Sequence, residues 1–203
     1  MSPGIMTSKL CTKLHNMAWE YRLGISTRGI TEVPLPGSNR SMTLSYADIF
    51  AILNRLSLTP DDALIDIGCG KGRVVCCAAR FPLREVIGIE HLPELCAAAR
   101  RNADRMRERK APITIVQAHA EEFDYRQGSV FYFYNSFGPP LLDRMLVRVR
   151  DSLDATKRPI RFASANAEHD ASFRACRWLE QYEYWDPSRI PSLAVTVSFW
   201  RSI

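Results

Sequence analysis

The sequence predicts an α/β protein with a three-layer fold, in which a central sheet of five parallel strands is finished by a C-terminal antiparallel hairpin. Two observations lead to this prediction. Short runs rich in β-branched and aromatic residues alternate along the chain with segments of helical periodicity, as a parallel sheet with crossover helices requires. The last two apolar runs have no room for a helix between them, so these two strands must pair antiparallel.

The strands are expected from seven apolar runs, each bounded by turn-forming residues. The five parallel strands are predicted, in chain order, over Ala63–Ile67, Glu85–Glu90, 112–117, 129–135 and 158–164. The terminal hairpin is predicted over 182–185 and 192–200, and the connector between its strands contains Pro187 and Pro191.

Helices are expected in the gaps between these strands. A helix over Tyr46–Arg55 has Thr43 or Ser45 as its expected N-cap. Further helices are predicted over 74–80, from Pro93 onward and over 139–153. In the last of these, Leu142, Met145, Leu146 and Val149 fall on one face, which indicates a helix that covers the sheet.

The first 42 residues stand apart from this alternation and precede a domain predicted over residues 43–203. They contain scattered glycines, prolines and apolar residues. We expect residues 1–42 to form an N-terminal extension or lid that faces the substrate. Trp19, Tyr21 and Leu23 indicate that part of it packs against the domain, and a disordered leader is the alternative.

Composition limits the classes of protein to consider. The 203 residues suit one domain with a proper core, and the hydrophobic content of 46% and charged content of 24% are ordinary for globular proteins. No run of ~18 apolar residues is available to cross a membrane. The N-terminus lacks the apolar core of a secretory signal. Six cysteines without a Cys-x-x-Cys pair indicate reduced thiols in a cytoplasmic protein and no zinc or other metal site.

The most informative motif is Asp-x-Gly-x-Gly-x-Gly at 66–72, directly after the first predicted strand. Glycines in this pattern allow a sharp turn and the close approach of a ligand to the backbone. Two common ligands are excluded by single positions. A dinucleotide fingerprint requires glycine where Arg73 stands, and a phosphate-binding P-loop requires Ser or Thr where Gly72 stands.

The motif resembles motif I of class I S-adenosylmethionine-dependent methyltransferases. Their Rossmann-like sheet also has five parallel strands and a terminal antiparallel hairpin. The resemblance implies S-adenosyl-L-methionine as the methyl donor and S-adenosyl-L-homocysteine as the product. Glu90 closes the second predicted strand, about 20 residues past the glycines, where an acid accepts hydrogen bonds from both ribose hydroxyls.

The resemblance also implies which residues form the cofactor site: Asp66, Gly68, Cys69, Gly70, Gly72, Glu90, His91, His119, Ala120 and Asn135. The glycines are expected at the methionine and ribose portion, with Asp66 ordering their loop. The backbone amide of Ala120 is expected to bind the adenine ring. His119 stands where the family usually has an acid. A neutral imidazole can accept from the adenine amine, and a surface histidine without a ligand role is the alternative.

The fourth predicted strand ends in Tyr134-Asn-Ser-Phe-Gly-Pro-Pro140, where many methyltransferases have their active-site loop. This loop is loosely similar to the Asn-Asn-Phe loop of the non-SET histone lysine methyltransferases and to small stand-alone bacterial methyltransferases. Asn135 is the expected catalytic residue, because its oxygen can align an acceptor amine. His169 is the candidate general base for a hydroxyl acceptor, and a surface histidine at the start of the next helix is the alternative.

The resemblance implies a methyltransferase whose acceptor is a nitrogen or oxygen on a small molecule or a protein side chain. A nucleic-acid substrate is the first alternative, since the net charge is +5. The densest basic run, at 100–110, interleaves its arginines with Asp104 and Glu108 and contains no aromatic residue to stack on a base, so it is typical of a solvated helix face. A non-catalytic protein that binds S-adenosylmethionine is the second alternative.

Overall fold

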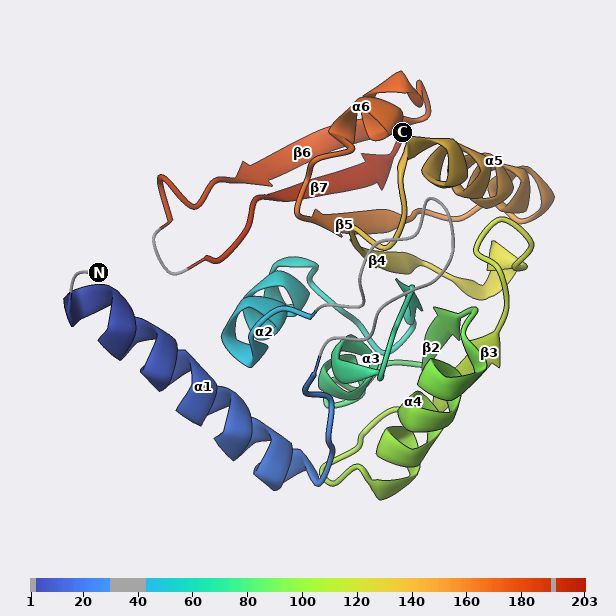
Figure 1. Ribbon diagram of the computed structural model, residues 1–203. Helices are drawn as coiled ribbons and strands as arrows, with labels where there is room; N and C mark the ends of the chain where they lie inside the picture. The colour runs from blue at the N-terminus through green and yellow to red at the C-terminus, as the bar shows by residue number, and fades with distance from the viewer. Residues whose placement is uncertain (1–2, 30–42, 191–192) are drawn as a thin grey trace.

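The central feature of the computed structural model, which describes residues 3–29, 43–190 and 193–203, is a seven-stranded sheet (Figure 1). The strand order is β3-β2-β1-β4-β5-β7-β6. The first five strands are parallel, and β7 runs antiparallel between β5 and β6. The predicted three-layer α/β class and its C-terminal antiparallel hairpin are therefore confirmed.

The strands follow the apolar runs of the sequence. Their bounds are β1 Ala63–Ile67, β2 Glu85–Glu90, β3 Ile113–Gln117, β4 Val130–Tyr134, β5 Arg161–Ala165, β6 Leu179–Trp185 and β7 Val197–Ser202. The first two have the predicted bounds. β3 starts one residue later than predicted because Pro112 has no N–H to donate to the ladder. β5 starts three residues later, because Pro159 has no N–H to donate and the Ile160 N–H donates to the Ser202 hydroxyl at 3.1 Å.

Helices cover both faces of the sheet. Their bounds are α1 Pro3–Leu23, α2 Tyr46–Arg55, α3 Arg73–Ala78, α4 Pro93–Arg105, α5 Pro139–Ala155 and α6 Asp170–Ala175. The apolar sides of α2, α3 and α4 pack on one face, and those of α5 and α6 on the other. Ser45 is the N-cap of α2, since its side chain accepts from the Asp48 N–H at 3.1 Å. None of the described helices is long and apolar enough to span a membrane.

The predicted N-terminal extension contains a long helix, α1, which the sequence pattern did not reveal. Trp19 stacks on Tyr46 of α2 with ring centroids 6.1 Å apart, and Leu23 is fully buried. The expectation that Tyr21 packs is wrong, because 82% of its surface is exposed. Residues 30–42 of the predicted extension, and Pro191 of the predicted connector, lie outside the described residues.

A buried ion pair joins this extension to the sheet domain. Glu20 of α1 and Arg73, the first residue of α3, approach to 3.4 Å and are 3% and 6% exposed. Arg73 also donates to the Thr27 hydroxyl at 2.7 Å and to the Leu44 carbonyl at 2.9 Å. Glu20 accepts from the Thr27 N–H at 2.8 Å. Such hydrogen bonding is what a buried ion pair requires to offset its desolvation.

Removing one partner of this pair is expected to destabilise the protein strongly. Glu20→Ala leaves the Arg73 guanidinium buried without its counter-charge, which costs about 3–5 kcal/mol in such pairs. Urea denaturation of the variant measures the loss in the free energy of unfolding.

Glu108→Ala is the matched control for this substitution. It breaks the exposed pair between Glu108 and Arg22, whose charged groups are 2.9 Å apart, and water screens such a pair. We expect a much smaller loss than for Glu20→Ala. Equal losses in the free energy of unfolding would show that the contribution of the Glu20–Arg73 pair to stability does not depend on its burial.

Candidate cofactor and active site

The glycine motif forms a tight loop between β1 and α3. Its three glycines have φ angles of 77°, 54° and 81° (Gly68, Gly70 and Gly72), a region that side chains disfavour. The N–H groups of Gly68 and Cys69 both donate to the Ile89 carbonyl at 2.9 Å. A Cβ atom at Gly68 would lie 2.3 Å from the Ser136 hydroxyl. Glycine is therefore required at position 68 both by the backbone conformation and by the close approach of Ser136.

The Glu90 carboxylate lies beside this loop at the end of β2. One oxygen accepts from the Gly70 N–H at 3.1 Å, and the other accepts from the N–H groups of His91 at 2.9 Å and Leu92 at 3.0 Å. The second oxygen, Oε1, also lies 3.2 Å from the Nδ1 atom of His91, whereas Oε2 accepts from Gly70 alone among the described residues and so keeps a site for a ligand hydroxyl. The side chain is thus fixed in place next to the glycine loop while it retains capacity to bind.

Asp66 is buried near the end of β1 and differs chemically from Glu90. Burial and the nearby negative charge of Glu90 raise the pKa of Asp66 to about 8. The loop's N–H groups donate to Ile89 and Glu90, so these residues take the ordering role that was expected of Asp66. Asp66 instead lies opposite Tyr132 of β4 in the parallel ladder.

Two predicted site residues, His91 and His119, meet at the ends of β2 and β3. Their rings stack with centroids 5.7 Å apart and an interplanar angle of 21°. The Nε2 atom of His91 is buried and has no hydrogen-bond partner in the described part of the chain. Ala120 is also buried, and its carbonyl accepts from the Tyr125 hydroxyl at 2.7 Å. An unpaired buried imidazole nitrogen suits a site that receives a polar ring.

The ends of β4 and β5 supply the other side of this edge of the sheet. Asn135 and Asn166 follow these strands with positive φ angles of 41° and 56°. The Asn135 amide donates to the Glu168 carboxylate at 3.3 Å. His169 is the N-cap residue of α6. It therefore stands at the start of a helix, which was the position expected under the alternative to a role as general base. It is Glu168, beside it in the sequence, that contacts Asn135.

Two residues at this edge were missed by the sequence analysis. Ser136 fills the space beside Gly68 and donates to the Ile67 carbonyl at 2.9 Å, which ties the loop after β4 to the glycine loop. Glu168 follows β5. Neither belongs to a recognisable motif, and the only available signal is that each comes just after the end of a parallel strand, where ligands of such sheets bind.

A family comparison agrees with this geometry. Residues 64–153, which include the glycine loop, Glu90 and Asn135, match the family described as a methyltransferase domain. Residues 64–153 therefore carry a methyltransferase domain. S-adenosylmethionine is the cofactor of this domain. A search of curated protein sequences finds no match.

Solved structures resemble the methyltransferase domain in fold. An RNA methyltransferase from Salinibacter ruber, in complex with S-adenosyl-L-homocysteine, is 23% identical with a TM-score of 0.58, over 79% of this chain and 92% of that one. Magnesium protoporphyrin IX methyltransferase from Synechocystis PCC 6803, with bound SAM, is 12% identical with a TM-score of 0.59, over 77% and 78% of the two chains. A SAM-dependent O-methyltransferase from Thermotoga maritima is 20% identical with a TM-score of 0.57, over 81% and 68%.

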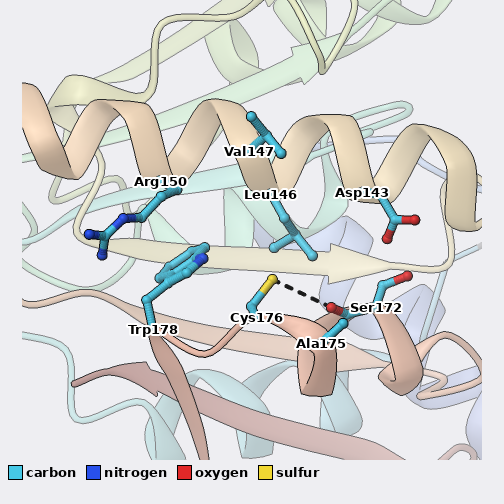
Figure 2. A pocket seen from close by; sticks show the side chains of 8 residues that line it. All are labelled: Asp143, Leu146, Val147, Arg150, Ser172, Ala175, Cys176 and Trp178. Carbon is cyan, nitrogen blue, oxygen red and sulfur yellow. Dashed lines mark hydrogen bonds between the residues drawn. The ribbon is translucent and has the colours of Figure 1, made fainter.

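The methyltransferase domain also has a separate hollow of about 240 Å³ between α5 and α6. Figure 2 shows Leu146 of α5 pointing toward Cys176 and Trp178 across it. The Cys176 thiol donates to the Ser172 carbonyl at 3.4 Å. None of the residues predicted for the cofactor or for catalysis lines this hollow, so it is distinct from the candidate cofactor site.

Glu90→Ala is expected to abolish cofactor binding or to weaken it greatly, because it removes the only side-chain acceptor that touches the glycine loop in the described structure. Isothermal titration with S-adenosylmethionine measures the affinity. Glu85→Ala, at the opposite end of the same strand, is the matched control and should bind normally. Undiminished affinity in Glu90→Ala would contradict the role of Glu90.

Asp66 makes the stability of the methyltransferase domain depend on pH. Its pKa is about 8 in the folded protein, against 3.8 for an ordinary Asp, so the folded state holds the proton more tightly than the unfolded state does. The stabilisation is complete below pH 3.8 and is lost as the pH rises toward 8. In urea denaturation from pH 5 to 8, Asp66→Asn should show a shallower fall in stability than the wild type. Parallel curves for the two proteins would rule out a raised pKa at Asp66.

Proposed function

We propose that this protein transfers the methyl group of S-adenosylmethionine to a nitrogen or oxygen nucleophile on a small molecule or a protein side chain. One observation carries the proposal: the glycine loop, Glu90 and Asn135 come from three different strand ends and lie at one edge of the sheet. Ligands of open α/β sheets bind at the carboxyl ends of the strands, so a donor and an acceptor can meet there.

The proposed cofactor site follows from the same geometry. The free acceptor capacity of Glu90 suits the ribose hydroxyls, and the bare backbone of Gly68, Gly70 and Gly72 suits the methionine and ribose portion. The stacked rings of His91 and His119, with the Ala120 amide, suit the adenine end. The orphan Nε2 atom of His91 supports this assignment, because a bound ring nitrogen or amine can pair with it.

Asn135 is proposed to position the acceptor. Methyl transfer is an in-line displacement, so the alignment of the acceptor lone pair supplies much of the rate. The backbone of Asn135, at φ 41°, holds its side chain at the end of β4, where the amide donates to Glu168. His169 stays a candidate base for a hydroxyl acceptor, one residue along from the Glu168 that touches Asn135.

Residues 1–42 are proposed to serve the site formed by the domain at 43–203, as an extension that borders it. The support comes from the part of the extension that the structure describes. The ammonium group of Lys71, inside the glycine motif, donates to the Arg28 carbonyl at 2.8 Å. Asn102 of α4 donates to the carbonyl oxygens of Ser26, at 3.0 Å, and Lys71, at 2.9 Å. The extension therefore runs alongside the cofactor loop.

A nucleic acid is the second candidate acceptor. Its support is the fold similarity to the RNA methyltransferase of Salinibacter ruber, together with the net charge of +5. Part of the basic surface is already neutralised, since Glu108 pairs with both Arg22, at 2.9 Å, and Arg80, at 2.8 Å. This pairing favours the small-molecule or protein acceptor.

Incubation with methyl-labelled S-adenosylmethionine and a fractionated cell extract tests the proposal. Label is expected in the small-molecule or protein fraction, and Glu90→Ala serves as the inactive control. Label confined to RNA or DNA would establish the second candidate. Cofactor binding without label in any fraction would overturn the proposed activity and favour a non-catalytic binding protein.

Replacing Asn135 should reduce turnover more than cofactor affinity. Asn135→Gly removes the side chain but keeps the left-handed backbone accessible, so it isolates the chemical role. We expect kcat to fall about 10²-fold, as for the loss of one positioned polar group in other active sites, with the cofactor Kd within a few-fold of wild type. Steady-state kinetics and calorimetry together measure both. The reverse order of effects would remove Asn135 from the active site.

A further inference from the structure

Helix α1 carries a row of exposed apolar side chains on its outer side. Among the described residues, seven large apolar side chains are exposed, and four of them belong to this helix. Their exposed fractions are 57% for Leu10, 56% for Leu14, 39% for Met17 and 82% for Tyr21. Single exposed apolar residues are ordinary, but several gathered on one element mark a surface that binds a partner.

The opposite side of α1 is already used by the fold. Four residues at helical spacing attach it to the domain: Asn16, Trp19, Glu20 and Leu23. At 3.6 residues per turn, the centre of the exposed row lies about 140° around the helix axis from this attached side. Figure 1 shows α1, in blue, on the outside of the molecule. A partner can therefore cover the row without disturbing the attachment.

The N-terminal part of the row lies on a stretch of helix that is exposed on all sides. Each of the six side chains at 10–15 is exposed in the described structure. Short helices are marginal in water, because tertiary packing of one face supplies most of their stability. A second surface laid against the row would supply packing that this stretch lacks in a single copy.

The spacing of the row favours another helix as this second surface. Its four members follow one another at intervals of four, three and four residues. These are the intervals between the a and d positions of a coiled coil, where side chains of one helix insert between those of the next. The row is therefore a short coiled-coil seam.

The order of the intervals favours a second copy of the same helix. The series four, three, four reads the same in both directions along the chain. When two copies of α1 lie antiparallel about a twofold axis, Leu10 therefore meets Tyr21 of the second copy, and Leu14 meets Met17. A twofold interface requires a surface that is complementary to itself in this way.

Charges beside the seam do not favour an anionic partner. Cys11 and Ala18, which border one side, are uncharged and small, so they allow two helices to approach closely. Arg22 is occupied by Glu108, at 2.9 Å. Among the side chains that the structure describes on α1, Lys13 is then the one cation without an ion pair. A lipid or nucleic-acid surface would be bound by several free cations.

The size of the seam indicates a reversible dimer. It spans about 16 Å of helix, and its four side chains expose less than the ~800 Å² that each partner contributes to a standard interface. The methyltransferase domain has its own buried core on both faces of the sheet. The copies are therefore expected to fold separately and to associate as their concentration rises.

We propose that two copies of this protein associate through α1, as an antiparallel helix pair with the seam of Leu10, Leu14, Met17 and Tyr21 at its centre. The inference goes beyond the proposed methyltransferase function and does not depend on it.

Sedimentation equilibrium of the full chain over a range of concentrations tests the association. We expect a monomer–dimer equilibrium, and Leu14→Glu should raise its dissociation constant about tenfold or more, because it places two carboxylates in the seam. Val147→Glu, at a similarly exposed apolar position of α5, is the control and should leave the constant unchanged. A dimer that Leu14→Glu does not weaken overturns the proposal. A wild type that is monomeric throughout also overturns it, and sedimentation of that monomer with phosphatidylglycerol vesicles would make a lipid surface the occupant.

Disulfide trapping tests the antiparallel arrangement. The exposed Cys11 is first replaced by serine, and Leu10→Cys and Tyr21→Cys are then made separately in this background. Positions 10 and 21 of opposite copies meet in the proposed pair, whereas two identical positions lie about 16 Å apart, too far for a disulfide. After oxidation, an equal mixture of the two variants should give about tenfold more linked dimer than either variant alone. Equal yields from one variant alone overturn the antiparallel arrangement.

Discussion

The site depends on a small set of hydrogen bonds at the end of β2. The Ile89 carbonyl accepts from the N–H groups of Gly68 and Cys69, and the Glu90 carboxylate accepts from Gly70. These bonds hold the loop, whose three glycines have left-handed backbone angles, and Ser136 leaves no space for a side chain at Gly68. This loop conformation determines the residue at which α3 begins. It also determines which backbone atoms of the glycines are open to a ligand. The fold and the proposed cofactor site therefore depend on the same contacts.

Arg73 links this loop to the rest of the chain. In the sequence it is the residue that excludes a dinucleotide fingerprint. In the structure its buried guanidinium holds Glu20, the Thr27 hydroxyl and the Leu44 carbonyl. The N-terminal extension is thereby anchored one residue beyond the glycine loop. Together with the bond from Lys71 to the Arg28 carbonyl, this attachment holds the described part of the extension, up to residue 29, against the glycine loop.

Charge is distributed unevenly between the surface and the site. The chain is basic overall, and arginines outside the site, such as Arg22 and Arg80, pair with acids such as Glu108. Asp66 and Glu90 lie at the carboxyl ends of neighbouring strands, and burial, together with repulsion by the negative charge of Glu90, raises the pKa of Asp66. A cationic donor such as S-adenosylmethionine relieves this repulsion. The net charge of the whole chain is thus a poor guide to what its site binds.

The sequence by itself determined the sheet, the order of its elements, the methyl donor and the positions of the glycine loop and Glu90. These features are local: strand periodicity, a glycine spacing and an acid that ends a strand can each be recognised within a few residues.

Only the tertiary structure decided the remaining features. Helix α1 escaped detection because it has apolar residues on two faces, with Trp19 packed and Leu14 exposed, so no single stripe marks it. The contact between Gly68 and Ser136 joins residues far apart in the chain. The pairing of Asn135 with Glu168 and the isolation of the Tyr132 hydroxyl likewise exist only once separate strand ends meet at one edge of the sheet.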